Sequence, residues 1–112
     1  MAGLGDLAGV SFLRPAPYGE PNYWLTCILI DPSAFGADRE AVRLALESHD
    51  IEARPTWKPL HLQPVLAEAP TLGGASAAHI FDTGLCLPSG SSLGDGDLAR
   101  IVEVIRSCAR ID

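Results

Sequence analysis

The 112-residue sequence is short of lysine, of cysteine and of long hydrophobic runs, and each shortage excludes a class of protein. Lys58 is the only lysine among eight basic residues, so any chemistry that needs an amine from this chain depends on it. The cysteines are few, odd in number and widely spaced, which argues against a disulfide framework and for the reducing cytoplasm: they are Cys27, Cys86 and Cys108. The longest apolar run, residues 24–30, is far shorter than the roughly 20 residues that span a bilayer. The first residues do not have the pattern of a secretory signal, so we expect no membrane partner.

The balance of charge excludes a second class of partner. Eight basic and 14 acidic residues give a net charge of −6, the opposite of the basic footprint of a nucleic-acid-binding protein. Hydrophobic residues make up 47% of the chain and recur along its whole length, which excludes a disordered acidic tail. Because 112 residues is an ordinary length for one domain, we expect residues 1–112 to form a single domain with its own core.

Apolar segments separated by prolines and glycines predict short strands and helices in alternation. Residues 22–31 are continuously apolar in their second half and end before Pro32, which predicts a strand buried on both faces. Residues 56–70 contain three prolines, so an irregular segment is expected there. The predicted strands are residues 7–13, 22–31, 51–54 (ended by Pro55) and 85–87, and the predicted helices are residues 39–49, 75–83 and 95–110.

Capping signals and hydrophobic periodicity refine the three helices. Asp38 is the expected N-cap of the first helix, whose predicted apolar face consists of Ala41, Val42, Ala45, Leu46 and His49. The second helix is expected to end at Gly84 in a left-handed conformation. The last helix is expected to begin at Gly94, with a staple between Leu93 and Leu98 and an apolar stripe of Leu98, Ile101, Val102, Ile105, Cys108 and Ala109. The order of elements predicts an α+β fold, in which helices are layered on one small, largely antiparallel sheet.

Residues 54–64 (RPTWKPLHLQP) hold the richest mixture of chemical groups in the chain. A guanidinium, an indole, the only ammonium, an imidazole and an amide suit an anionic ligand that carries a ring; the candidate substrate-binding residues are therefore Arg54, Trp57, Lys58, His61 and Gln63. The alternative is structural: Trp57 fills the core, and the prolines stiffen a segment that docks on a neighbouring domain. Histidines and cysteines lack metal-ligand spacing, so no metal site is expected. The turn at residues 88–92 lacks the lysine of a phosphate-binding P-loop.

With these motifs in order, the sequence resembles the C-terminal domain of DegT/DnrJ/StrS-type sugar aminotransferases, which are pyridoxal-phosphate (PLP) enzymes that aminate nucleotide-linked keto sugars. The likeness is carried by residues 22–26, 54–64 and 84–90 and by the acidic start and apolar stripe of the last helix, and it extends from about Leu4 onward. The Trp-Lys-Pro-Leu-His form looks most like the subgroup that acts on UDP- or GDP-linked 4-keto sugars.

The resemblance implies the small C-terminal domain of a fold-type I PLP aminotransferase, with the large PLP-binding domain absent from this sequence. It also implies that Trp57, Lys58 and His61 lie near the mouth of the active site and contact the sugar nucleotide. In the family the lysine that holds PLP belongs to the large domain, so Lys58 is not its counterpart. We therefore expect no catalytic or cofactor-binding residue in this chain, no PLP bound by it alone, and no transamination without the rest of the enzyme.

Three functions remain open at this point. The first is a domain, either part of a longer enzyme or encoded separately, that helps to form the substrate pocket in the biosynthesis of cell-surface polysaccharides or glycans. The second is a non-enzymatic module that binds a nucleotide sugar or another subunit, and the third is a degenerate remnant. Because apolar faces without their larger domain favour association, we expect a homo-oligomer formed through residues 57–66 or the apolar flank of the first helix.

Overall fold

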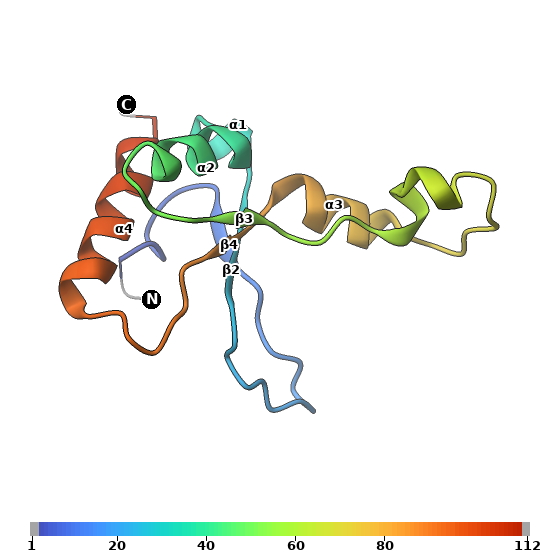
Figure 1. Ribbon diagram of the computed structural model, residues 1–112, viewed down its shortest axis with the longest axis horizontal. Helices are drawn as coiled ribbons and strands as arrows, with labels where there is room; N and C mark the ends of the chain where they lie inside the picture. Colours follow the sequence, from blue (N-terminus) through green and yellow to red (C-terminus); the bar gives the residue numbers. More distant parts are fainter. Residues whose placement is uncertain (1–2, 111–112) are drawn as a thin grey trace.

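Strands and helices alternate along the chain much as the sequence predicts, and the computed structural model describes residues 3–110 (Figure 1). The strands are β1 (Val10–Phe12), β2 (Thr26–Ile30), β3 (Arg54–Pro55) and β4 (Gly84–Leu87). The α-helices are α1 (Pro32–Phe35), α2 (Arg39–Glu47), α3 (Ala75–Thr83) and α4 (Asp95–Ser107), with 3-10 turns η1 (Leu60–Leu62) and η2 (Pro64–Leu66). The predicted α+β class is confirmed; the one-turn helix α1 was not predicted.

The four strands form one antiparallel sheet in the order β1-β2-β4-β3. In Figure 1, α2 and α4 lie to one side of this sheet, and α3 with η1 and η2 extends away from it to the other. We call residues 56–74 together with α3 the arm, and the sheet with α1, α2 and α4 the body. The element order therefore divides one short chain into a packed body and a protruding arm.

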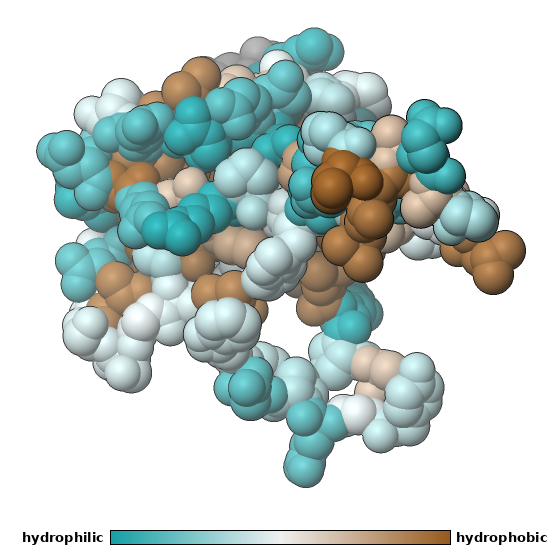
Figure 2. Space-filling view, turned by 45° about the vertical axis from the view of Figure 1, so that its right-hand side comes forward, coloured by the Kyte–Doolittle hydropathy of each residue, from teal (hydrophilic) through white to brown (hydrophobic). Residues whose placement is uncertain are grey.

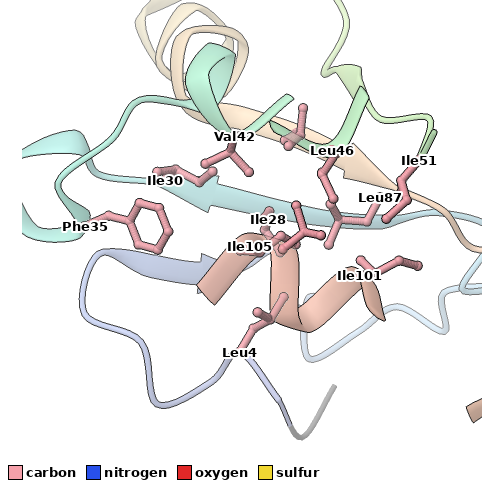
Figure 3. Close-up of a cluster of buried hydrophobic side chains, with 12 residues drawn as sticks. Leu4, Ile28, Ile30, Phe35, Val42, Leu46, Ile51, Leu87, Ile101 and Ile105 are labelled. Carbon is pink, nitrogen blue, oxygen red and sulfur yellow. The ribbon is translucent and has the colours of Figure 1, made fainter. Parts of the chain in front are cut away.

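The core lies between the sheet and helices α2 and α4 (Figure 3). Its largest fully buried side chains come from the sheet and from the helices: they are Phe35, Ile28, Ile30, Leu46, Leu85, Ile105 and Val42. Ile28 and Ile30 alternate along β2 and so point to the same face, as the period of a strand requires. Helix α2 places Val42 and Leu46 one turn apart on its inner side.

The prediction that residues 22–31 form a strand buried on both faces is wrong. Pairing begins only at Thr26, and the side chain of Trp24 is 70% exposed. The Asn22 side chain accepts a hydrogen bond from the Trp24 amide at 3.1 Å, and Tyr23 has a positive φ of 51°, so a local turn replaces the start of the strand. Helices α2 and α4 cover only one face, which leaves alternate residues of β2 less buried.

Helix α2 follows its predicted start but not its predicted end. The Asp38 side chain accepts from the Ala41 amide at 2.8 Å, which confirms the N-cap. Ala41 and His49 are exposed, and the helix ends before His49 because the chain turns through Asp50 at a φ of 57°. The amide of Ile51 then donates to the Leu46 carbonyl at 3.0 Å, which closes the turn and buries Ile51.

Gly84 is required for a reason other than the predicted one. Its backbone is extended, with φ −88° and ψ 141°, and it begins β4 instead of closing α3 in a left-handed conformation. A Cβ atom at this position would collide with the Ile80 carbonyl oxygen and with the Thr56 side chain. Close packing of α3 against the strands, and not backbone freedom, therefore excludes a side chain here.

The short β3 and the stripe of α4 also differ from the predictions. Burial alternates from Ile51 to Arg54, but only Arg54 and Pro55 pair with β4, so the proline lies within the strand instead of ending it. On α4, Val104 is buried although it is not in the predicted stripe, and Leu98 of that stripe is 47% exposed. The Gly94 amide donates to the Asp97 carboxylate at 2.9 Å, in the first turn of the helix.

Candidate functional site

A groove of about 590 Å³ lies where β3 and β4 meet the loop after β4 and the start of α4. Trp24 and Leu25 border it before β2, Arg54 and Trp57 border it from β3 onward, and Cys86 and Ser89 from β4 onward. The groove therefore brings together residues from all four stretches that carry the family resemblance. Both tryptophans of the chain take part in it.

Trp57 is exposed because side chains continue to alternate in direction after β3. Thr56 points inward: its side chain is only 3% exposed, and its hydroxyl donates to the Ile80 carbonyl at 2.7 Å. The next residue, Trp57, is therefore directed outward and is 66% exposed. The alternative that Trp57 fills the core of this chain is wrong. Two indole faces, from Trp24 and Trp57, are available at the groove for stacking.

Arg54 presents its guanidinium at the surface beside Glu52. Its Nε atom donates to Glu52 Oε1 at 2.7 Å, and the two side chains are 78% and 72% exposed. An ion pair this exposed contributes little to stability, so a phosphate group can take the place of the Glu52 carboxylate at small cost. Arg54 is thus available to an anionic ligand at the edge of the groove.

The remaining charges of the groove are mixed. Asp50, Glu52 and Asp97 line it together with Arg54 and Arg100, and the Arg100 guanidinium also donates to the His49 carbonyl. Burial raises the pKa of the Cys86 thiol to about 11, with a further contribution from the adjacent Cys27. Cys86 is therefore protonated at neutral pH, and no thiolate lines the groove at that position.

The other predicted residues lie on the arm and not in the groove. Lys58 is exposed and makes no ion pair among residues 3–110. The half-buried ring of His61 packs against Gly74, where a Cβ would lie 2.7 Å from His61 Cε1. The side-chain amide of Gln63 donates to the Lys58 carbonyl at 3.3 Å. The structure thus brings Arg54 and Trp57 together and separates Lys58, His61 and Gln63 from them.

Trp24, Ser89 and Arg100 border the groove but were not among the predicted site residues. The signal for Trp24 was the Asn22-Tyr23 pair, which favours a turn and so makes the following tryptophan a loop residue. Ser89 accepts a hydrogen bond from the Thr26 amide at 2.7 Å, and this contact joins residues 63 positions apart. No local sequence pattern predicts a hydrogen bond between residues so far apart.

Among residues 3–110, histidine, cysteine and carboxylate side chains do not gather into a group that could hold a metal ion. The same residues do not fit PLP. An aldimine requires a lysine amine at the bottom of a pocket, and Lys58 is exposed on the arm and outside the groove. Within the described part of the chain, no helix has the length and apolarity needed to cross a bilayer.

Comparison with known proteins agrees with the resemblance. The model of the DegT/DnrJ/EryC1/StrS aminotransferase family matches residues 1–106. EpsN of Bacillus subtilis (strain 168), which is assigned as a pyridoxal phosphate-dependent aminotransferase, is 37% identical over 106 residues, covering 91% of this chain and 26% of EpsN. GDP-perosamine synthase of Vibrio cholerae is 34% identical over 87 residues, covering 77% of this chain and 23% of the synthase.

Comparison of the fold with solved structures also finds sugar aminotransferases. The crystal structure of DesI, determined in the presence of its TDP-sugar product, superposes with a TM-score of 0.83 at 26% identity, covering 96% of this chain and 28% of DesI. The chain therefore spans about a quarter of the length of the curated relatives that it matches.

Proposed function

The chain belongs to the DegT/DnrJ/EryC1/StrS aminotransferase family, and we propose that it forms the small C-terminal domain of a PLP-dependent enzyme that aminates nucleotide-linked keto sugars. The observation that carries this proposal is the groove with Trp24, Trp57 and Arg54 at its border. A nucleotide sugar combines a flat base with a diphosphate, and these groups match two indoles and an exposed guanidinium. The odd number of cysteines supports a cytoplasmic enzyme.

In this proposal the residues of the chain bind and orient the substrate. Arg54 exchanges Glu52 for a phosphate oxygen of the diphosphate, and Trp57 stacks on the base or the sugar ring. Lys58, His61 and Gln63 contact the substrate from the arm, once the rest of the enzyme holds the arm in place. PLP, bound elsewhere in such an enzyme, supplies the electron sink for transamination.

Mixing the chain with PLP tests whether the cofactor is bound by another part of the enzyme. We expect no stable imine absorbance, and an imine band that is lost in Lys58→Ala would contradict the proposal.

Binding is tested by NMR titration of the chain with UDP-glucose, GDP-mannose and TDP-glucose. We expect at least one of them to shift the indole N–H signals of Trp24 and Trp57 more than signals elsewhere. Arg54→Ala should weaken that binding by about 10- to 150-fold, because a hydrogen bond to a charged group is worth about 1.5–3 kcal/mol. Arg14→Ala, which removes an exposed arginine outside the groove, is the matched control and should bind as the unaltered chain does. Absence of any shift at about millimolar ligand would remove the binding proposal.

A second function, as an interaction module, is favoured by the apolar surface of the arm. Figure 2 shows hydrophobic side chains gathered on this protruding part, where Leu60, Val65 and Leu72 are 73%, 89% and 100% exposed. Such a surface favours association with another copy of the chain or with the remainder of the enzyme. This proposal agrees with the homo-oligomer expected from the sequence.

Sedimentation velocity over a range of concentrations tests self-association. We expect an average mass that rises with concentration, and a strictly monomeric chain at high concentration would contradict the proposal. Val65→Ser and Leu44→Ser distinguish the two candidate surfaces, because Val65 lies on the arm and Leu44, 51% exposed, lies on the flank of α2. The variant that lowers the average mass identifies the surface that associates.

A further inference from the structure

Cys27 in β2 and Cys86 in β4 lie directly opposite each other in the antiparallel ladder. Their Sγ atoms are 3.6 Å apart, although 59 positions separate the residues in sequence. Neither cysteine takes part in the function proposed above, apart from the position of Cys86 on the wall of the groove. The two thiols therefore form a chemical group that the sequence spacing concealed.

Hydrogen bonding on the other side of β4 determines the geometry of this pair. The Thr56 amide donates to the Gly84 carbonyl at 3.2 Å, so the peptide groups of Gly84 are directed toward β3. Polar groups alternate in direction along a strand, and those of Cys86, two residues on, are therefore also directed toward β3. Toward β2, Cys86 occupies a non-hydrogen-bonded position, where opposite Cα atoms are about 4.5 Å apart and side chains approach most closely. That separation lies within the range of about 4.4–6.8 Å that a disulfide requires.

The environment of the pair makes one thiol accessible and shelters the other. Ile28 and Leu85, which follow and precede the cysteines, point into the core, so the cysteines occupy the opposite face of the sheet. Cys27 is half-buried, whereas Cys86 is 8% exposed. An oxidant in solution therefore meets Cys27 first and leaves Cys86 as the second thiol.

We propose that Cys27 and Cys86 are a modification site, a dithiol that a low-molecular-weight disulfide such as oxidised glutathione converts to an intramolecular cross-strand disulfide. The Cys27 thiolate attacks one sulfur of oxidised glutathione, so that a mixed disulfide forms and one glutathione thiolate leaves. Cys86 then loses its proton to solvent and attacks Cys27 Sγ, which expels the second glutathione thiolate. Two electrons pass from the protein to oxidised glutathione, and two molecules of reduced glutathione are released. The bond would join β2 to β4 at the wall of the groove.

Mass spectrometry of the whole chain after treatment with oxidised glutathione tests this site. We expect a product lighter by two hydrogens with no retained glutathione, and peptide mapping should find Cys27 joined to Cys86. A disulfide that includes Cys108, a covalent dimer, or persistent glutathione adducts as the main product would each overturn the proposal. The mapping needs no substitution, so it remains decisive even if a variant fails to fold.

Three serine variants sharpen the test. Cys108→Ser is the matched control, because Cys108 lies at the end of α4 and its thiol donates to the Val104 carbonyl at 3.4 Å, outside the pair. It should close the disulfide at the rate of the unaltered chain. Cys86→Ser should stop at the glutathione adduct on Cys27, and Cys27→Ser should form no internal disulfide. Closure that survives either of these two substitutions would overturn the assignment.

Discussion

The body and the arm use similar apolar residues in opposite ways. In the body, aliphatic side chains of β2, β4, α2 and α4 pack on one another until several have no exposed surface, as Ile28 and Leu46 show. In the arm, helices η1, η2 and α3 contain no buried residue, and Leu72 is fully exposed. The body therefore holds the buried core of residues 3–110, and the arm presents its apolar residues at the surface.

The attachment of the arm to the body also differs in kind from the packing of the body. The Thr56 amide donates to the Gly84 carbonyl of β4 at 3.2 Å, and the Arg39 side chain of α2 donates to the Asp82 carbonyl of α3 at 3.0 Å. The Arg39 guanidinium also stacks 5.0 Å from the centre of the Phe81 ring. Specific polar contacts thus orient α3, where the body relies on apolar burial.

A matched pair of leucine substitutions tests this comparison and has the largest expected effect. Leu46→Ala removes a fully buried side chain and should lower the free energy of unfolding by about 2–5 kcal/mol, through lost burial and the cavity left behind. Leu72→Ala removes the same atoms from a fully exposed position and should change it by less than about 0.5 kcal/mol. Urea denaturation followed by circular dichroism measures both. Equal losses would show that the arm packs into the core in solution.

Oxidation of Cys27 and Cys86 sharpens the comparison because the disulfide would lie wholly within the sheet. Closing a loop between residues 59 positions apart should raise the free energy of unfolding by up to about 4 kcal/mol, less any strain in the folded state. Hydrogen exchange of the oxidised and reduced chains should show slower opening in β2 and β4 and unchanged exchange in the arm. Equal slowing in both regions would mean that the arm unfolds together with the body.

The smallest expected effect is the pH dependence of the exposed carboxylates in the body. Hydrogen bonds from Arg43 lower the pKa of Glu40, and the Ser33 hydroxyl and amide lower that of Asp31. Because each folded-state pKa lies below its unfolded value, the stabilisation is present at neutral pH and is lost as the pH falls through the folded-state pKa. Urea midpoints at about pH 7 and about pH 3 measure this loss. Glu40→Gln should lose less than the unaltered chain, and an equal loss would exclude the Glu40 contribution.

Much of the secondary structure was predictable because its signals are local. The Asp38 cap, the bounds of α3 and the Gly94 start of α4 depend on residues a few positions apart, and the structure confirms them. The errors occur where a distant segment decides the outcome. Gly84 begins β4 and admits no side chain because α3 and Thr56 crowd it, and Trp24 is exposed because a turn at Tyr23 precedes β2.

In the candidate site, too, the chemistry of the residues was predictable from local sequence, but their positions depend on distant segments. Residues 54–64 were identified from their chemistry, yet only Arg54 and Trp57 of the predicted site residues reach the groove. Trp57 is outward because Thr56 is held inward by α3, a contact across 24 positions. His61 instead packs against Gly74 on the arm.

The sequence by itself determined the class of fold, the order of its elements and the chemical groups available, because periodicity, capping and composition act over a few neighbouring residues. Only the tertiary structure decided which of those groups meet. The pairing of Cys27 with Cys86 and the joining of Trp24 to Trp57 in one groove both follow from strand register. Register is set by how the whole apolar face of each strand packs on α2 and α4, and no short segment contains that information.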